Sequence, residues 1–152
     1  MMTTAVVLVD TPNLRSSVIR RFGSGAQPDY RALIEAVNAN TKSVLAEAIV
    51  NGGVPATLTH HLTSLGYRVV YSHAEDCDEM LIARAVALHR SADLFVLGSG
   101  DGKFGSLVQI LRSLGKQVFV AAVPGSVSAR LTRAANRVLE FPAHTAERRA
   151  AA

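Results

Sequence analysis

The stretch that decides the fold runs from residue 93 to residue 104 and reads Asp-Leu-Phe-Val-Leu-Gly-Ser-Gly-Asp-Gly-Lys-Phe. Its first half, residues 94–97, is a short apolar run rich in strand-forming side chains, and three glycines interrupt it before a helical pattern begins at Phe104. A buried strand that passes through small residues into a helix places Ser99 and Asp101 on a surface crest. In open α/β sheets, ligands bind beyond the carboxyl ends of the strands. We therefore expect the functional site near Asp101.

The rest of the chain repeats this alternation of apolar strands and helices. Residues 5–9 form a continuous apolar run that ends at Asp10, which is typical of a buried parallel strand with a carboxylate at its tip. Further strands are expected at 43–50 (where Ala and Glu also permit a helix), 67–71, 118–123 and 138–141, and helices at 14–22, from 28, at 55–65, from 76 or 78, at 104–114 and up to 135. This order predicts an α/β fold, a three-layer sandwich in which helices flank a mostly parallel central sheet.

Length and composition bound the class of protein. With 152 residues, 49% of them apolar, and no repeat or linker, the chain is expected to form one domain with a sizeable core. The apolar runs are too short for a transmembrane helix, and the N-terminus resembles a first strand more than a signal peptide. The single cysteine, Cys77, excludes an internal disulfide and favours a reducing compartment. We expect a cytoplasmic protein without a membrane partner; monomer and homodimer both stay open.

The charge balance leaves two interpretations open. Sixteen Lys and Arg residues against twelve Asp and Glu residues give a net charge of +4 and an isoelectric point near 9.7. A basic domain of this size is compatible with a phosphate-backbone partner, and equally with an ordinary solubilising surface. Aromatic residues are few and tryptophan is absent, which argues against a broad base-stacking platform.

Carboxylates are expected to gather at one edge of the sheet. Asp10 and Asp101 follow strands, and one helix begins with Asp76, Asp78 and Glu79. If the strands at 5–9 and 94–97 are neighbours, these groups converge, and their mutual repulsion is costly unless they share a cation. Oxygen ligands of this kind suit Mg²⁺ or Mn²⁺, which can support phosphodiester hydrolysis.

Structural roles compete with this interpretation. Asp101 could cap the helix that follows it, while Asp78 and Glu79 could be first-turn acids stabilised by the helix dipole. We favour the dipole role for Asp78 and Glu79 and the site role for Asp10 and Asp101. The glycine-rich crest is not a P-loop, because Leu97 occupies the first glycine position, and it is not a dinucleotide fingerprint either.

Three segments resemble the NYN domain, the LabA-like branch of the PIN-like nucleases. Val-Leu-Val-Asp10-Thr-Pro-Asn13-Leu resembles the opening of the family, where a strand ends in Asp and Asn follows three residues later. Leu-Gly-Ser99-Gly-Asp101-Gly-Lys-Phe is similar to the family's Ser-Gly-Asp-x-Asp-Phe block, and residues 126–141 resemble its closing stretch. The resemblance covers nearly the whole chain with its order and spacing intact.

The resemblance implies a PIN-like fold, which we expect over residues 1–141. Residues 142–152 have no obvious core role and are expected to form a flexible tail. It also implies a ribonuclease whose acidic cluster binds Mg²⁺ or Mn²⁺, because Asp10, Asp78 and Asp101 match the family acids. In that interpretation Asp10 and Asp101 are direct metal ligands and Asp78 positions a second metal or the attacking water. Asn13 and Ser99 would hold the substrate phosphate, and Arg15 or Lys103 would stabilise it.

Three departures from the family pattern weaken the match. Lys103 stands where the family block has its second aspartate, Pro12 stands where many members carry an acid, and Arg84 stands where the following helix often carries another. Fewer acids and added cations should lower metal affinity, although an ammonium could replace a metal electrostatically or bind the scissile phosphate. A relative that binds RNA or a protein partner without cleaving is therefore the second hypothesis. A small-molecule nucleotide binder, supported by the fold alone, is the third.

Overall fold

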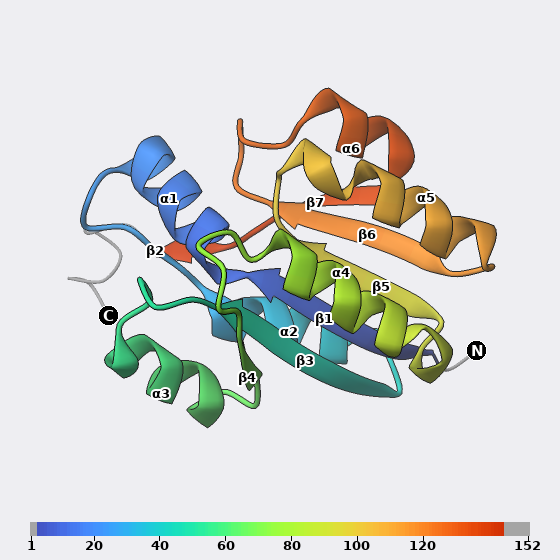
Figure 1. Ribbon diagram of the computed structural model, residues 1–152, viewed down its shortest axis with the longest axis horizontal. Helices are drawn as coiled ribbons and strands as arrows, with labels where there is room; N and C mark the ends of the chain where they lie inside the picture. The colour runs from blue at the N-terminus through green and yellow to red at the C-terminus, as the bar shows by residue number, and fades with distance from the viewer. Residues whose placement is uncertain (1–2, 145–152) are drawn as a thin grey trace.

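A six-stranded parallel sheet forms the centre of the computed structural model, which describes residues 3–144 (Figure 1). The strand order is β4-β3-β1-β5-β6-β7, and every neighbouring pair is parallel. The strands are β1 (Thr4–Asp10), β3 (Ser43–Val50), β4 (Arg68–Tyr71), β5 (Leu94–Gly98), β6 (Gln117–Ala122) and β7 (Arg137–Glu140). These strands confirm the α/β fold expected from the alternating pattern.

Helices cover both faces of the sheet and complete the three layers. They are α1 (Thr11–Phe22), α2 (Tyr30–Asn38), α3 (Ala56–Ser64), α4 (Asp78–Ala87), α5 (Gly105–Ser113) and α6 (Ala129–Ala134), with short 3₁₀ turns η1 (His89–Ser91) and η2 (Gly102–Phe104). In Figure 1, α4 and α5 lie in front of the sheet and α2 lies behind it. Within residues 3–144, no helix combines the length and the apolar character needed to cross a membrane.

The period of two along β1 divides the core into two clusters. Ala5, Val7 and Val9 pack with apolar side chains of α1, α2 and α3 on one face of the sheet. Val6 and Leu8 pack with apolar side chains of α4, α5 and α6 on the other. Because β1 is central, all five of these side chains are completely buried, which is why the sequence shows a continuous apolar run instead of alternation.

The end of the domain differs from the expectation. Ala143 and His144 form β8 (Ala143–His144), which pairs antiparallel with β2 (Gln27–Pro28). The predicted tail from residue 142 therefore includes a short paired strand, and the part of it at 145–152 lies outside the described residues. A pairing of two residues per strand is too short to leave a periodic pattern in the sequence.

A buried ion pair joins β3 to α4. Glu47 has no exposed surface and accepts two hydrogen bonds from Arg84, from Nε to Oε1 at 2.7 Å and from Nη2 to Oε2 at 2.8 Å. The more exposed Arg68 lies 3.9 Å from the same carboxylate. The pairing with Glu47 raises the pKa of Arg84. Arg84 thus compensates a structural carboxylate in the core. In the comparison with the family pattern, it was counted as a cation added to the acidic cluster.

Arg84→Met should strongly destabilise the fold, because it leaves the Glu47 carboxylate buried without its bidentate partner. We expect the free energy of unfolding to fall by about 3–5 kcal/mol, measured by urea denaturation. Arg68→Met is the matched control and should cost no more than about 1 kcal/mol, because Arg68 is exposed. Equal effects of the two substitutions would contradict this assignment, and Glu47→Leu combined with Arg84→Met should recover most of the loss.

Candidate functional site

The candidate site lies where β1 and β5 end side by side. The chain leaves β1 toward β3 on one side and later returns to β5 on the other, so the strand order reverses at this pair. Val9 is in register with Gly98, which brings Asp10 and the crest after β5 to the same edge. A depression of about 430 Å³ opens there, which we call the acidic hollow; it is lined by Asp10, Pro12, Asn13, Ser16, Glu75, Asp76, Cys77 and Asp101. The convergence of Asp10 with Asp101 is the arrangement that the sequence predicted.

Hydrogen bonds hold the two segments of the hollow together. The Ser99 hydroxyl, completely buried, donates to Asn13 Oδ1 at 3.2 Å and accepts from the Asp101 backbone N–H at 3.1 Å. Asp10 accepts from the Asn13 backbone N–H at 3.4 Å, and Asp101 accepts from the Lys103 backbone N–H at 3.0 Å. Asp101 therefore caps the η2 turn and lines the hollow at once, so the two roles weighed from the sequence do not compete. Ser99 and Asn13 thereby hold the backbone of the crest in place.

The crest approaches a neighbouring loop closely, which explains one of its glycines. A Cβ added at Gly100 would lie 2.4 Å from the backbone oxygen of Ser126. The Gly100 carbonyl in turn accepts the backbone N–H of Ser128 at 3.0 Å. Only glycine allows this contact, and the contact fixes the position of the backbone next to Asp101.

Asp10 is the electrostatically strained group of the site. It is 4% exposed, and burial raises its pKa to about 6. The hydrogen bond from Asn13 opposes this shift, and the negative charges of Asp76, Asp101 and Asp78 add to it. A carboxylate with this environment is held ready for a cation that would relieve both desolvation and repulsion.

Lys103 points into the acidic cluster. Its Nζ donates to Asp76 Oδ2 at 2.8 Å and lies 3.9 Å from Asp78 Oδ2. The hydrogen bond to Asp76 raises the pKa of Lys103 and lowers that of Asp76, whereas burial and the Asp76 carboxyl raise the pKa of Asp78. Asp76, which the sequence analysis noted but did not choose, lines the hollow; Asp78, which it chose, does not. In the sequence, the only sign of a role for Asp76 was its position two residues before Asp78, at the start of the same helix.

Two further residues have positions that the sequence did not reveal. The Arg15 guanidinium donates to the Gly53 carbonyl at 3.3 Å and does not line the acidic hollow, so the expected contact with a phosphate there is not supported. Cys77 does line it, but burial raises the pKa of its thiol to about 11. A thiol of that pKa is protonated at neutral pH and is a poor nucleophile.

The donor chemistry of the hollow fits a hard divalent cation. Asp10, Asp76 and Asp101 provide carboxylate oxygens and Asn13 an amide, which is the ligand type of Mg²⁺ and Mn²⁺. Within residues 3–144, however, no three His, Cys, Asp or Glu side chains are close enough together to hold a metal ion as they stand. A cation at this place would therefore be held by one or two carboxylates and complete its shell with waters and phosphate oxygens, as Mg²⁺ commonly does.

The family model of the NYN domain matches residues 4–142. The chain belongs to this family. NYN domains generally bind RNA, and the family includes PIN-like nucleases. No curated protein matches the chain.

A solved structure supports the fold of this NYN domain. A protein of unknown function from Vibrio parahaemolyticus superposes with a TM-score of 0.84 at 23% sequence identity. The match covers 93% of this chain and 94% of the other. At this identity the likeness establishes the three-layer architecture alone.

Asp10→Asn should stabilise the metal-free NYN domain at neutral pH. Because the folded state raises the pKa of Asp10 from 3.8 to about 6, the folded protein binds the proton more tightly, and stability falls as pH rises from about 4 to 6. Asn cannot ionise, so the variant should gain up to about 3 kcal/mol at pH 7 and nothing near pH 3. Urea denaturation across this pH range in EDTA measures the difference. A gain that is the same at all pH values would contradict the role of ionisation.

Proposed function

We propose that this NYN domain hydrolyses RNA phosphodiesters at the acidic hollow with the help of Mg²⁺ or Mn²⁺. The observation that carries the proposal is the environment of Asp10, a buried carboxylate with a raised pKa beside three other acids. Keeping such a group charged at neutral pH costs desolvation free energy, and a cation bound from solution offsets that cost. Membership of a family that binds RNA supports the choice of substrate.

Each side chain has a distinct part in the proposal. Asp10 and Asp101 would hold the cation from two adjacent strand ends, and Asn13 and Ser99 fix the crest so that the Asp101 carboxylate faces the hollow. A divalent cation bound there would supply charge stabilisation for the phosphate and Lewis acidity for the attacking water. The charge of Asp78 contributes to the raised pKa of Asp10. In this proposal Asp78 also positions the attacking water.

The ammonium of Lys103 favours a second candidate function, RNA binding without cleavage. Lys103 neutralises Asp76 at 2.8 Å and so provides part of the positive charge that a second cation would bring. With this cation in place, the hollow can hold a phosphate group while its affinity for a metal is reduced. In the hydrolytic proposal, the same ammonium releases Asp76 and binds the scissile phosphate when substrate enters.

Asp101→Asn should abolish metal-dependent cleavage if the first proposal is correct. The substitution keeps the size of the side chain but removes the charge of a direct ligand. We therefore expect a loss of more than about 100-fold, which exceeds the effect of changing a residue that only orients a ligand. The assay uses end-labelled single-stranded and hairpin RNA with Mg²⁺, Mn²⁺ or EDTA. Products that persist equally in the purified variant or in EDTA would indicate a contaminating nuclease.

Lys103→Asp separates the two candidate functions. It restores the acid of the family block, so metal affinity should rise, and cleavage should increase in an active enzyme or appear in an inert one. Lys116→Asp is the matched control, because it makes the same charge change at the opposite end of α5. Cleavage gained only by Lys103→Asp from an inert wild type would identify a disarmed nuclease that binds RNA. Silence of the wild type and of both variants would contradict hydrolysis.

A further inference from the structure

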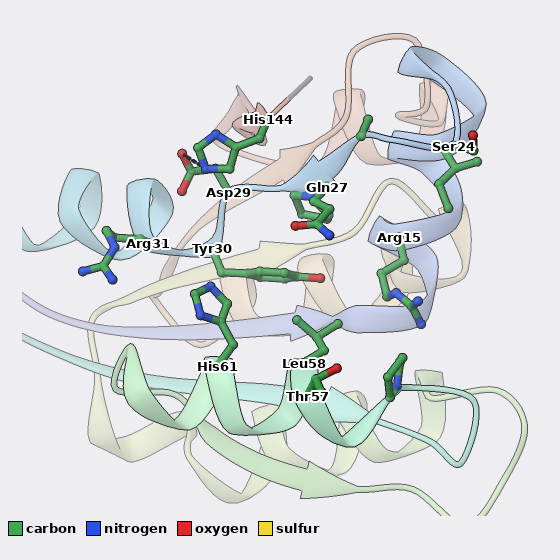
Figure 2. Close-up of a pocket in the computed structure, with 14 residues that line it drawn as sticks. Arg15, Ser24, Gln27, Asp29, Tyr30, Arg31, Thr57, Leu58, His61 and His144 are labelled. Carbon is green, nitrogen blue, oxygen red and sulfur yellow. Dashed lines mark ion pairs between the residues drawn. The ribbon is translucent and has the colours of Figure 1, made fainter. Parts of the chain in front are cut away.

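A second pocket lies beside the C-terminal half of α1, away from the acidic hollow. It has a volume of about 510 Å³, within the range of small-ligand sites. Helices α1, α2 and α3 contribute Arg15, Tyr30 and His61, and apolar side chains such as Leu58 form part of its wall (Figure 2). We call it the Tyr30 pocket.

Shared lining residues connect this pocket with the acidic hollow. An intermediate depression of about 690 Å³ shares Pro12, Ser16 and Glu75 with the acidic hollow and shares Arg15 and Ile19 with the Tyr30 pocket. The four of these residues that belong to α1 are spaced i, i+3, i+4 and i+7, so they form one face of that helix. The three depressions follow one another along that face, and we call them together the α1 groove.

The charge changes sign along the α1 groove. Carboxylates surround the end at Asp10, whereas Arg15, Arg31 and His61 lie at the Tyr30 pocket. The one acid that lines the pocket, Asp29, forms an ion pair with His144 at 2.9 Å. A chain with repeated phosphates can thus meet a metal-binding end and a cationic end on the same path.

A buried donor marks the floor of the Tyr30 pocket. Tyr30 is 3% exposed, and its hydroxyl has no hydrogen-bond partner among the described residues. Burial raises its pKa, so the hydroxyl stays protonated and can donate. Figure 2 shows it directed toward the side of the pocket where Arg15 lies. A buried hydroxyl without a protein partner is unusual, and this donor is free to bind an acceptor that enters the pocket.

We propose that the α1 groove carries single-stranded RNA away from the acidic hollow and that the Tyr30 pocket holds one nucleotide of that strand. The Tyr30 hydroxyl and the Arg15 guanidinium bind its oxygen atoms, and Leu58 and Ile19 contact the apolar faces of the base or ribose. Because the hydroxyl is covered, entry of the nucleotide requires rotation of the lining side chains. The assignment rests on the proposed RNA substrate and names the part of the protein that binds it outside the acidic hollow.

Binding of labelled oligouridylates, from two to about ten nucleotides long, tests this assignment by fluorescence anisotropy. Ca²⁺ replaces Mg²⁺ to neutralise the acidic hollow. Tyr30→Phe should weaken binding of the long oligomers about 5-fold by loss of one hydrogen bond, without lowering thermal stability. Arg15→Met should weaken binding similarly and lower the salt dependence by about 0.7 in the logarithmic slope.

Arg90→Met is the matched control, because Arg90 is an exposed arginine that precedes β5 and so lies at the opposite edge of the sheet. It should bind like the wild type. If Asp101→Asn loses cleavage but Tyr30→Phe and Arg15→Met bind long RNA normally, the groove assignment is overturned and the catalytic proposal stands. If nothing is cleaved but both variants bind less RNA, the groove assignment stands without hydrolysis. A wild type that binds no RNA overturns both.

Discussion

The parallel pairing of β1 with β5 is the constraint on which the rest of the structure depends. It places two strand ends of opposite chain halves side by side, at the point where the strand order of the sheet reverses. Apart from Thr4, every residue of both strands is buried, so packing on two faces fixes their register. The geometry of the hollow therefore rests on the hydrophobic packing of β1 and β5.

Two carboxylates are buried among residues 3–144, and they lie in opposite environments. Glu47, in the middle of β3, is compensated by two hydrogen bonds from Arg84. Asp10, at the end of β1, accepts one long backbone hydrogen bond and faces other acids. The first arrangement joins a helix to the sheet. The second leaves charge uncompensated at an open edge, which is the pattern expected of a functional group and not of a structural one.

Much of the fold and part of the site could be predicted from the sequence. Apolar runs locate the strands because buried parallel strands have few polar side chains, and the carboxyl ends of such strands share one edge; Asp10 and Asp101 followed from these two facts. The partner of a long charged side chain could not be predicted, because it depends on how elements distant in sequence are placed. Arg84 was expected at the acidic cluster and binds Glu47, and the ammonium of Lys103 selects Asp76 over its neighbour Asp78.

The single cysteine of the chain is an internal probe of local opening at the acidic hollow. Cys77 is 2% exposed at the start of α4, between the two aspartates that meet Lys103, and its high pKa suppresses thiolate formation. Its reaction with a thiol reagent therefore requires the β4–α4 segment to open. The rate of that reaction reports the local opening equilibrium without any introduced label. The hollow thus contains its own measure of rigidity, readable in the unmodified protein.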